Sequence, residues 1–265
     1  MMATVAPLTA LAPEPTRSRG RPSTMFVWLS ALCLLIAVIG FIPTYWAQIA
    51  QNTFRGTPLI HLHAIVFTAW PLLLVSQSVL IARGGLRHHR AWGLAGIVLA
   101  TTMFLVGLAT AVVGMEHRIA QGYGDLGRHF LVVPFAAIGG FYGFFIAAIA
   151  NINRSEWHKR FIIVATASVL QAAMARFFFY AAHGMAAGQR PDSFPPAPVA
   201  ASLLPIFTLD LIIVGGAVID WRRGGKVHPA WLWGLGILVP VQLLRVPLSQ
   251  TDAWMAFADW LTRFT

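Results

Sequence analysis

Histidines recur at both ends of the long apolar runs in this chain, where imidazole nitrogens could bind a metal or a haem. His63 and His129 open runs that enter from one side, and His158 opens a run that enters from the other side, with His88 or His89 near it. A haem held by two histidines needs ligands from two helices with a narrow slot between them. The pairs His63 with His129 and His89 with His158 are therefore candidate ligands for haem b.

A slot for the porphyrin could come from Gly139 and Gly143, which form a G-x-x-x-G pair below His129. A second alternative is a zinc site at His89, His158 and His228, but no short-range ligand signature is present and the neighbouring cations would repel a metal ion. We therefore predict no metal site. A third alternative is that the nine histidines are anchors at membrane interfaces.

Three charged residues lie deep in the apolar runs: Asp210, Arg176 and Arg245. Asp210 is about 11 residues from the start of its run, or roughly 16 Å along a helix. A lone charge at such a depth costs at least about 2.5 to 3.5 kcal/mol. We therefore predict that Asp210 contacts Arg176 or Arg245, directly or through Gln171 or Gln242, inside an outward-facing polar cavity. A bridge that only fixes helix packing and a site on a substrate or proton path are both open at this point.

A polar and aromatic stripe follows the second apolar run. His63, Trp70 and Gln77 are seven residues apart and share a helix face, whereas His61 points to nearly the opposite side. In lipid such a stripe usually faces neighbouring helices, where its polar groups find partners. The pattern favours helix packing over cofactor binding.

The elements that must position these residues are membrane-spanning helices. The chain of 265 residues is 57% hydrophobic and 11% charged, which is typical of a protein with the bilayer as its solvent. Seven runs are each near the roughly 20 residues that cross a bilayer as a helix. They are residues 25–46, 58–82, 92–114, 129–150, 161–182, 199–219 and 230–249. The fold class is therefore an all-α bundle of about seven spans.

Positive charge alternates along the chain, and this predicts an orientation. Cations concentrate before the first run and in every second connector, and the intervening connectors hold fewer. The concentrated groups are Arg17, Arg19 and Arg21; Arg83, Arg87 and Arg90; Arg154, Lys159 and Arg160; and Arg222, Arg223 and Lys226. This asymmetry predicts a cytoplasmic N-terminus and an outer C-terminus in a bacterial inner membrane.

Three regions follow from the same pattern. Residues 1–24 are predicted to be a disordered cytoplasmic tail, residues 25–250 the seven-helix domain, and residues 251–265 a short amphipathic segment on the outer surface. The net charge of +10 lies in the connectors, so we exclude nucleic acid as a partner. The partner is the lipid bilayer, with other membrane subunits or a homo-oligomer as further candidates.

Two stretches, residues 62–93 and 154–177, resemble a group of uncharacterised bacterial seven-helix membrane proteins. The similar features are an early Leu-His, a Trp and a Gln along the second run, His-Arg before the third and His-Lys-Arg before the fifth. The resemblance covers roughly half of the chain and implies an inner-membrane bundle. A looser likeness to cytochrome b561-like proteins implies histidines near both membrane faces, although here the histidines of the cytoplasmic side lie at helix entries.

Three functions are compatible with these patterns. The first is a redox or cofactor-binding membrane protein with b-type haem, linked to quinone. The second is a carrier or binder of a small molecule or proton, built on the buried Asp-Arg cavity. The third is an accessory subunit without chemistry of its own. No P-loop, dinucleotide fingerprint or nucleophile elbow is present, which argues against nucleotide-driven and hydrolytic enzymes.

Overall fold

The computed structural model describes residues 24–184 and 194–264, and these form helices and connecting turns without a strand. The predicted all-α class is therefore confirmed for the described chain. The predicted tail falls almost entirely outside the described residues, as does 185–193 of the connector between the fifth and sixth runs. The main helices are α1 (Met25–Phe41), α2 (Ala47–Ala50), α3 (Pro58–Ala82), α4 (Leu86–Arg118), α5 (Gly124–Phe130), α6 (Val132–Ala150), α7 (Ser155–Val169), α8 (Gln171–His183), α9 (Leu203–Gly224), α10 (Pro229–Leu248) and α11 (Asp252–Leu261).

Six helical segments are long and apolar enough to cross a membrane, and the pair α7 and α8 makes a seventh if it counts as one span. These two helices meet at Leu170 with a bend of 43°. Helices are the form expected in lipid, because they satisfy their backbone hydrogen bonds internally. The protein is therefore a multi-pass membrane protein with six to seven candidate spans.

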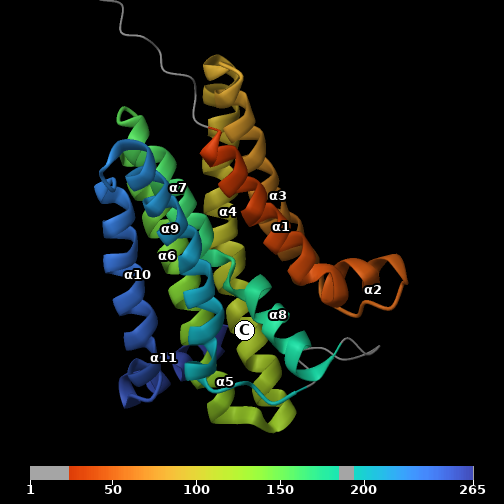
Figure 1. The fold of residues 1–265 in the computed structure, drawn as a ribbon. Coiled ribbons are helices and arrows are strands. Elements are labelled where there is room, and N and C mark those ends of the chain that lie inside the picture. The colour runs from red at the N-terminus through yellow and green to blue at the C-terminus, as the bar shows by residue number, and fades with distance from the viewer. Residues whose placement is uncertain (1–23, 185–193, 265) are drawn as a thin grey trace, which may run out of the picture.

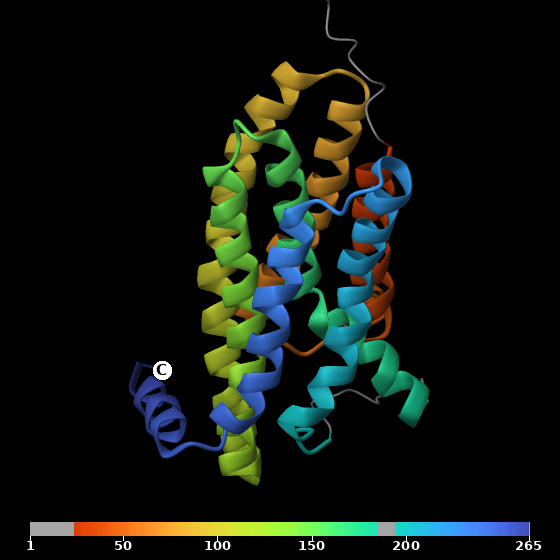
Figure 2. The ribbon, with the colours of Figure 1, turned by 60° about the vertical axis from the view of Figure 1, so that its left-hand side comes forward.

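The helices lie side by side in an elongated bundle (Figures 1 and 2). Helices α1, α3 and α4 pack together on one side, while α6, α7, α9 and α10 form the other. The start of α1 and the connectors α3–α4, α6–α7 and α9–α10 lie at the same end, which we call the basic end. The opposite end holds α2, α5, α11 and the last turns of α8. The three cation-rich connectors of the sequence thus lie at one end of the bundle, where α1 also begins.

Several helices are longer than the apolar runs that predict them. Helix α4 has 33 residues, or about 50 Å, because it begins at Leu86 and continues to Arg118, outside the predicted run 92–114. Polar residues at both ends continue the helix beyond the thickness of the hydrocarbon. A π-helical segment, Ile119–Tyr123, then turns the chain at Gly122, whose φ of 88° favours glycine.

Two glycines allow close helix contacts that shape the bundle. A Cβ on Gly216 of α9 would lie 2.6 Å from the indole ring of Trp231, so this glycine lets the ring cross α9. A Cβ on Gly40 of α1 would lie 2.6 Å from the backbone oxygen of Ala173, so the first turn of α8 packs directly on α1. The bend at Leu170 therefore directs α8 towards α1.

The C-terminal segment forms helix α11 beside α5 at the end opposite the basic end. The Thr251 hydroxyl caps α11 by accepting a hydrogen bond from the Trp254 backbone at 3.2 Å. The Trp254 indole donates to the Arg128 carbonyl at 3.0 Å, and Asp259 pairs with the Arg128 guanidinium at 2.5 Å. Ala258 is buried, whereas Phe257 and Trp260 remain exposed, as in a helix that covers the bundle with one face.

Candidate functional site

A buried polar network lies where α8, α9 and α10 meet. Arg245 donates from one terminal nitrogen to Gln171 Oε1 at 2.8 Å. Its other terminal nitrogen donates to the carbonyl and the hydroxyl of Ser202, at 3.1 and 2.7 Å. Gln171 is the first residue of α8 after the bend, and Ser202 directly precedes α9. Interruptions in two helices therefore bring polar groups to the guanidinium, which is only 2% exposed.

Asp210, on α9, forms a hydrogen-bonded pair with Gln242 next to these residues. Its Oδ1 accepts a hydrogen bond from Gln242 Nε2 at 3.2 Å, and Gln242 lies one turn before Arg245 on α10. Pro240 and Pro247 flank these two residues and lack the backbone N–H that completes a helix. We call Asp210, Gln242, Arg245, Gln171 and Ser202 the central polar network.

The central polar network is only partly satisfied. Asp210 Oδ2, Gln242 Oε1 and Arg245 Nε are buried without a hydrogen-bond partner among the described residues. No ion pair within 4 Å joins Asp210 to Arg245 in the same part of the chain. Two acceptors and one donor thus remain available in a buried site, which is costly unless another group engages them.

Arg176, the third deep charge of the sequence, takes other neighbours. Its Nε donates to Thr44 Oγ1 at 3.0 Å, one terminal nitrogen donates to the Ala172 carbonyl at 2.7 Å, and its guanidinium lies 4.1 Å from the centre of the Phe41 ring. The contacts with Thr44 and Phe41 place Arg176 against the end of α1 and the π-helical segment Ile42–Trp46 that follows it.

A second set of charged residues lies around the buried Arg160 near the basic end, where α7, α9 and α10 meet. Arg160 and Asp220 form a two-pronged pair, with Nε to Oδ2 and a terminal nitrogen to Oδ1 both at 2.8 Å. The remaining terminal nitrogen of Arg160 donates to the carbonyl and carboxylate of Glu156, and the Trp231 indole donates to Asp220 Oδ2 at 2.8 Å. Every nitrogen of this guanidinium and both oxygens of Asp220 therefore have partners. We call Arg160, Asp220, Glu156 and Trp231 the ionic cluster.

Two of the predicted haem ligands come together near the basic end. The rings of His89 and His158 lie 6.3 Å apart between centroids, nearly perpendicular to each other. His158 Nδ1 bonds to the Ala148 carbonyl at 2.9 Å, which leaves its Nε2 free to face another group. His228 instead packs edge-on against Trp157, at 5.0 Å. Among the described residues, no group of three or more His, Cys, Asp or Glu side chains is placed to hold a metal ion.

The other predicted pair has separate surroundings. His63 stacks on Phe67 at 4.0 Å, and His129 Nδ1 bonds to the carbonyl of Ser249 at the end of α10. Gly139 and Gly143, the predicted slot, are both exposed, and a Cβ on either would meet nothing within 4 Å. These glycines thus face away from the packed protein, and haem binding at His63 and His129 stays a prediction.

The polar stripe on α3 divides into two parts. Trp70 is buried, donates to Thr166 Oγ1 at 3.1 Å and packs edge-on against Phe141 and Phe145. This is the interhelical role that the spacing favours. Both amide atoms of Gln77 are buried without a hydrogen-bond partner in the described chain.

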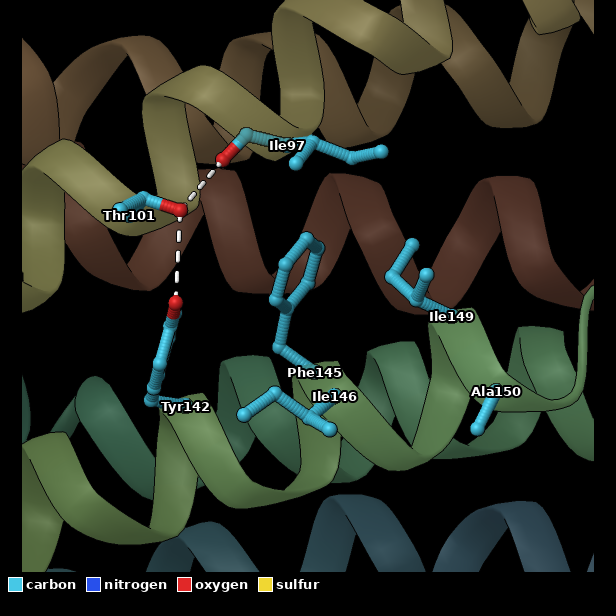
Figure 3. Close-up of a pocket in the computed structure, with 7 residues that line it drawn as sticks. All are labelled: Ile97, Thr101, Tyr142, Phe145, Ile146, Ile149 and Ala150. Carbon is cyan, nitrogen blue, oxygen red and sulfur yellow. Dashed lines mark hydrogen bonds between the residues drawn. The ribbon is translucent and has the colours of Figure 1, made fainter.

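An apolar groove opens between α4 and α6 (Figure 3). It has a volume of about 340 Å³, and Figure 3 shows side chains from both helices along it. At one end, Thr101 Oγ1 and the Tyr142 hydroxyl lie 3.4 Å apart and join the two helices. The other residues that line it are Ile97, Phe145, Ile146, Ile149 and Ala150.

Sequence reasoning missed Ser202 and the ionic cluster. The sequence marks Arg160 only as an orientation signal, since cations cluster in its connector. Asp220 was the available clue, because an acidic residue that ends an apolar run beside two arginines can pair with a cation from another helix. Ser202 gave no such signal, because its role depends on its carbonyl as well as its hydroxyl.

Comparison of the chain with protein-family models, curated proteins and solved structures finds no match. The functional assignment therefore depends on the chain's own residues and geometry.

Proposed function

We propose that the protein is a proton-linked carrier of the bacterial inner membrane, and that Asp210 is the residue that binds and releases the proton. The observation that supports this proposal is the partly satisfied central polar network. Intramembrane carboxylates without an ion-pair partner are typical of proton and substrate paths, because an unused charged group in lipid would be costly to keep.

The proposed proton step involves Asp210 Oδ2. A proton from water on one side of the membrane bonds to this oxygen, and the carboxylate becomes a neutral carboxyl. The Gln242 amide holds Oδ1 and orients the group, at 3.2 Å. Release returns the proton to water on the other side. Arg245 is a positioning residue, because it ties α10 to Gln171 and Ser202.

The bend between α7 and α8 supports a moving part. Broken helices at the depth of a binding site are a recurrent feature of secondary transporters, where one group of helices moves against another. Gln171 lies directly at this bend and bonds Arg245, so a change in the bend angle would alter the central polar network. We propose that the carrier transports a small polar ligand together with the proton. A ligand with both donor and acceptor groups would match the two acceptors and one donor that remain free in the central polar network.

The test is proton movement by the full-length protein in liposomes that contain a pH-sensitive dye. We expect an imposed potential to drive proton flux in the wild type and not in Asp210→Asn. The matched control is Asp259→Asn, which removes an exposed acid of α11. Infrared difference spectra should show a carboxyl band on acidification that Asp210→Asn removes. Wild-type flux and an unchanged band in a folded Asp210→Asn protein would contradict the proposal.

The proposal includes seven spans, with α7 and α8 as one bent span, the N-terminus in the cytoplasm and the C-terminus outside. The location of the three cation-rich connectors at the basic end supports this orientation. Reporters fused after Gly85 and Gly225 should give cytoplasmic signals, and one fused after Gly188 should give an outer signal. A cytoplasmic signal at Gly188 would overturn the seven-span topology.

A second proposal keeps b-type haem, with His89 and His158 as the ligands. The supporting observation is the 6.3 Å separation of their rings on two different helices. Bound haem would supply electron transfer, as the likeness to cytochrome b561-like proteins implies. The absorption spectrum of protein purified from haem-replete cells tests this directly. We expect an intense haem band that His89→Ala removes, and colourless protein would exclude the proposal.

A further inference from the structure

We propose that the groove between α4 and α6 is a binding site for an anionic phospholipid of the leaflet at the basic end. One acyl chain lies in the groove and the phosphate lies between Arg90 and Arg154. This site is separate from the central polar network and does not depend on its function. The observations that support it are the apolar lining, the position of the groove in the spans and the charge at its mouth.

The groove has the dimensions and chemistry of an acyl-chain site. Its residues on α6 run from Tyr142 to Ala150, or about 12 Å along the helix, which is less than half of a hydrocarbon core of about 30 Å. The volume of about 340 Å³ is in the range of small-ligand pockets. Both walls belong to candidate spans, so the open side of the groove faces the bilayer. A chain from one leaflet can therefore fill it.

The inner end of the groove is closed by the Thr101 and Tyr142 hydroxyls, as Figure 3 shows. Tyr142 is held in place by stacking on Phe104, with 4.4 Å between centroids. Thr101 also donates to the Ile97 carbonyl at 3.0 Å, so its hydroxyl is already satisfied within α4. The floor is Phe145, which is buried. This end offers little to a headgroup, so the headgroup must lie at the other end.

The other end of the groove leads to exposed arginines. Arg90, Ile97 and Thr101 are separated by seven and four residues and lie on one stripe of α4. Arg154 follows Ala150 by four residues, in the turn that leaves α6. Neither arginine forms an ion pair within the part of the chain that the structure describes.

The rings of His89 on α4 and His158 on α7 lie 6.3 Å apart between centroids, and His158 bonds to the Ala148 carbonyl near the end of α6. The start of α4 therefore lies near the end of α6, and we place both arginines at this mouth of the groove. A phosphate there complements two positive charges, and each basic residue near a membrane surface favours an anionic lipid by about five-fold.

The test measures lipids bound to the full-length protein by native mass spectrometry. Protein in mixed micelles is offered phosphatidylglycerol and phosphatidylcholine with identical chains. We expect one tightly held phosphatidylglycerol on the wild type, with a preference of at least about ten-fold. The double variant Arg90→Gln with Arg154→Gln should lose the preference but still bind lipid, and Ala150→Trp should lose the bound lipid by filling the groove.

Two matched controls separate the site from general effects. Arg222→Gln removes an exposed arginine at the same end of the bundle, and Ala95→Trp adds an indole to another face of α4. Both should keep the lipid. Equal retention of the two lipids by the wild type would overturn the proposal, and so would retention by Ala150→Trp. A dimer that Gly143→Leu dissociates would assign this face to a second copy of the chain instead.

Discussion

The central polar network and the ionic cluster involve the same helices, α9 and α10 with α7 or its continuation α8, but they treat buried charge differently. In the ionic cluster, Arg160 and Asp220 satisfy each other at two points, and neighbouring groups satisfy what remains. In the central polar network, Asp210 and Arg245 each keep a polar atom without a partner among the described residues. A structural contact between helices is most stable when all of its polar groups are hydrogen-bonded, whereas a binding site needs donors and acceptors that remain free for a ligand.

Asp210 and Asp220 make the comparison testable, because both are aspartates of α9, ten residues apart. Asparagine has nearly the shape of aspartate, removes the charge and replaces one acceptor oxygen with a donor NH2 group. We expect Asp220→Asn to lower stability, and we expect Asp210→Asn to abolish proton flux with little effect on stability.

The largest loss of stability is expected from Asp220→Asn. The substitution breaks the two-point pair with the buried Arg160, leaves only the exposed Glu156 as a counter-ion, and replaces one acceptor with a donor. Breaking such a pair typically costs about 3 to 5 kcal/mol. Denaturant unfolding in detergent should show this loss, and the double variant Asp220→Asn with Arg160→Gln should recover part of it. Wild-type stability of Asp220→Asn would show that the ionic cluster does not hold the helices together.

A smaller loss is expected from Arg245→Gln. The guanidinium satisfies the Gln171 side chain and two atoms of Ser202, and glutamine is too short to reach all three. Each buried group left unpaired costs about 1 to 3 kcal/mol, but the loss of an imperfectly satisfied charge offsets part of this. Unfolding experiments should give a value between those of Asp220→Asn and Asp210→Asn.

Asp210→Asn should change stability by less than about 1 kcal/mol while it abolishes proton flux. The carboxylate makes one hydrogen bond in the described chain, to Gln242, and asparagine can keep it through its own carbonyl. Melting curves and liposome flux measured on the same preparation check both halves of the statement. A loss as large as that of Asp220→Asn would mean that Asp210 is a structural residue.

Trp70→Phe tests a single interhelical bond against these clusters. The substitution removes the hydrogen bond to Thr166 but keeps the aromatic contacts with Phe141 and Phe145. A neutral hydrogen bond contributes about 0.5 to 1.5 kcal/mol, and we expect a loss in this range without an effect on flux. A larger loss in unfolding experiments would show that Trp70 also packs in a way that phenylalanine cannot reproduce.

The sequence predicts the helices well because each long apolar run must satisfy its backbone inside a helix. It also predicts which polar residues are candidates for the central polar network, since Asp210, Gln171, Gln242 and Arg245 are conspicuous in apolar surroundings. It does not predict the place of Arg176. The position of Arg176 depends on the bend at Leu170. No proline or glycine lies beside Leu170, so the sequence does not predict this bend.

The ionic cluster was beyond prediction for a different reason. Arg160 belongs to a connector with other cations, and such residues usually carry only an orientation signal. The burial of Arg160 follows from the close approach of Trp231 to Gly216. This approach brings the Trp231 indole to Asp220, the partner of Arg160. A contact of this kind between α9 and α10 is set by tertiary packing and leaves no periodic pattern in the sequence.

The smallest expected effect is a pH dependence at His228, next to the ionic cluster. His228 caps α10, because its Nδ1 accepts the Ala230 backbone N–H at 3.1 Å. Burial and the nearby Arg160 charge lower the pKa of His228 from the ordinary value of 6.5. A protonated ring would lose the accepting lone pair, so the folded state favours the neutral form. The unfolded chain takes up the proton first as the pH falls, and the contribution of His228 to stability is therefore full above pH 6.5 and is lost below it.

Melting temperatures measured from pH 7.5 to 5 should fall slightly more for the wild type than for His228→Asn, which keeps a capping group that does not titrate. Identical pH profiles for the two proteins would show that the cap makes no titratable contribution.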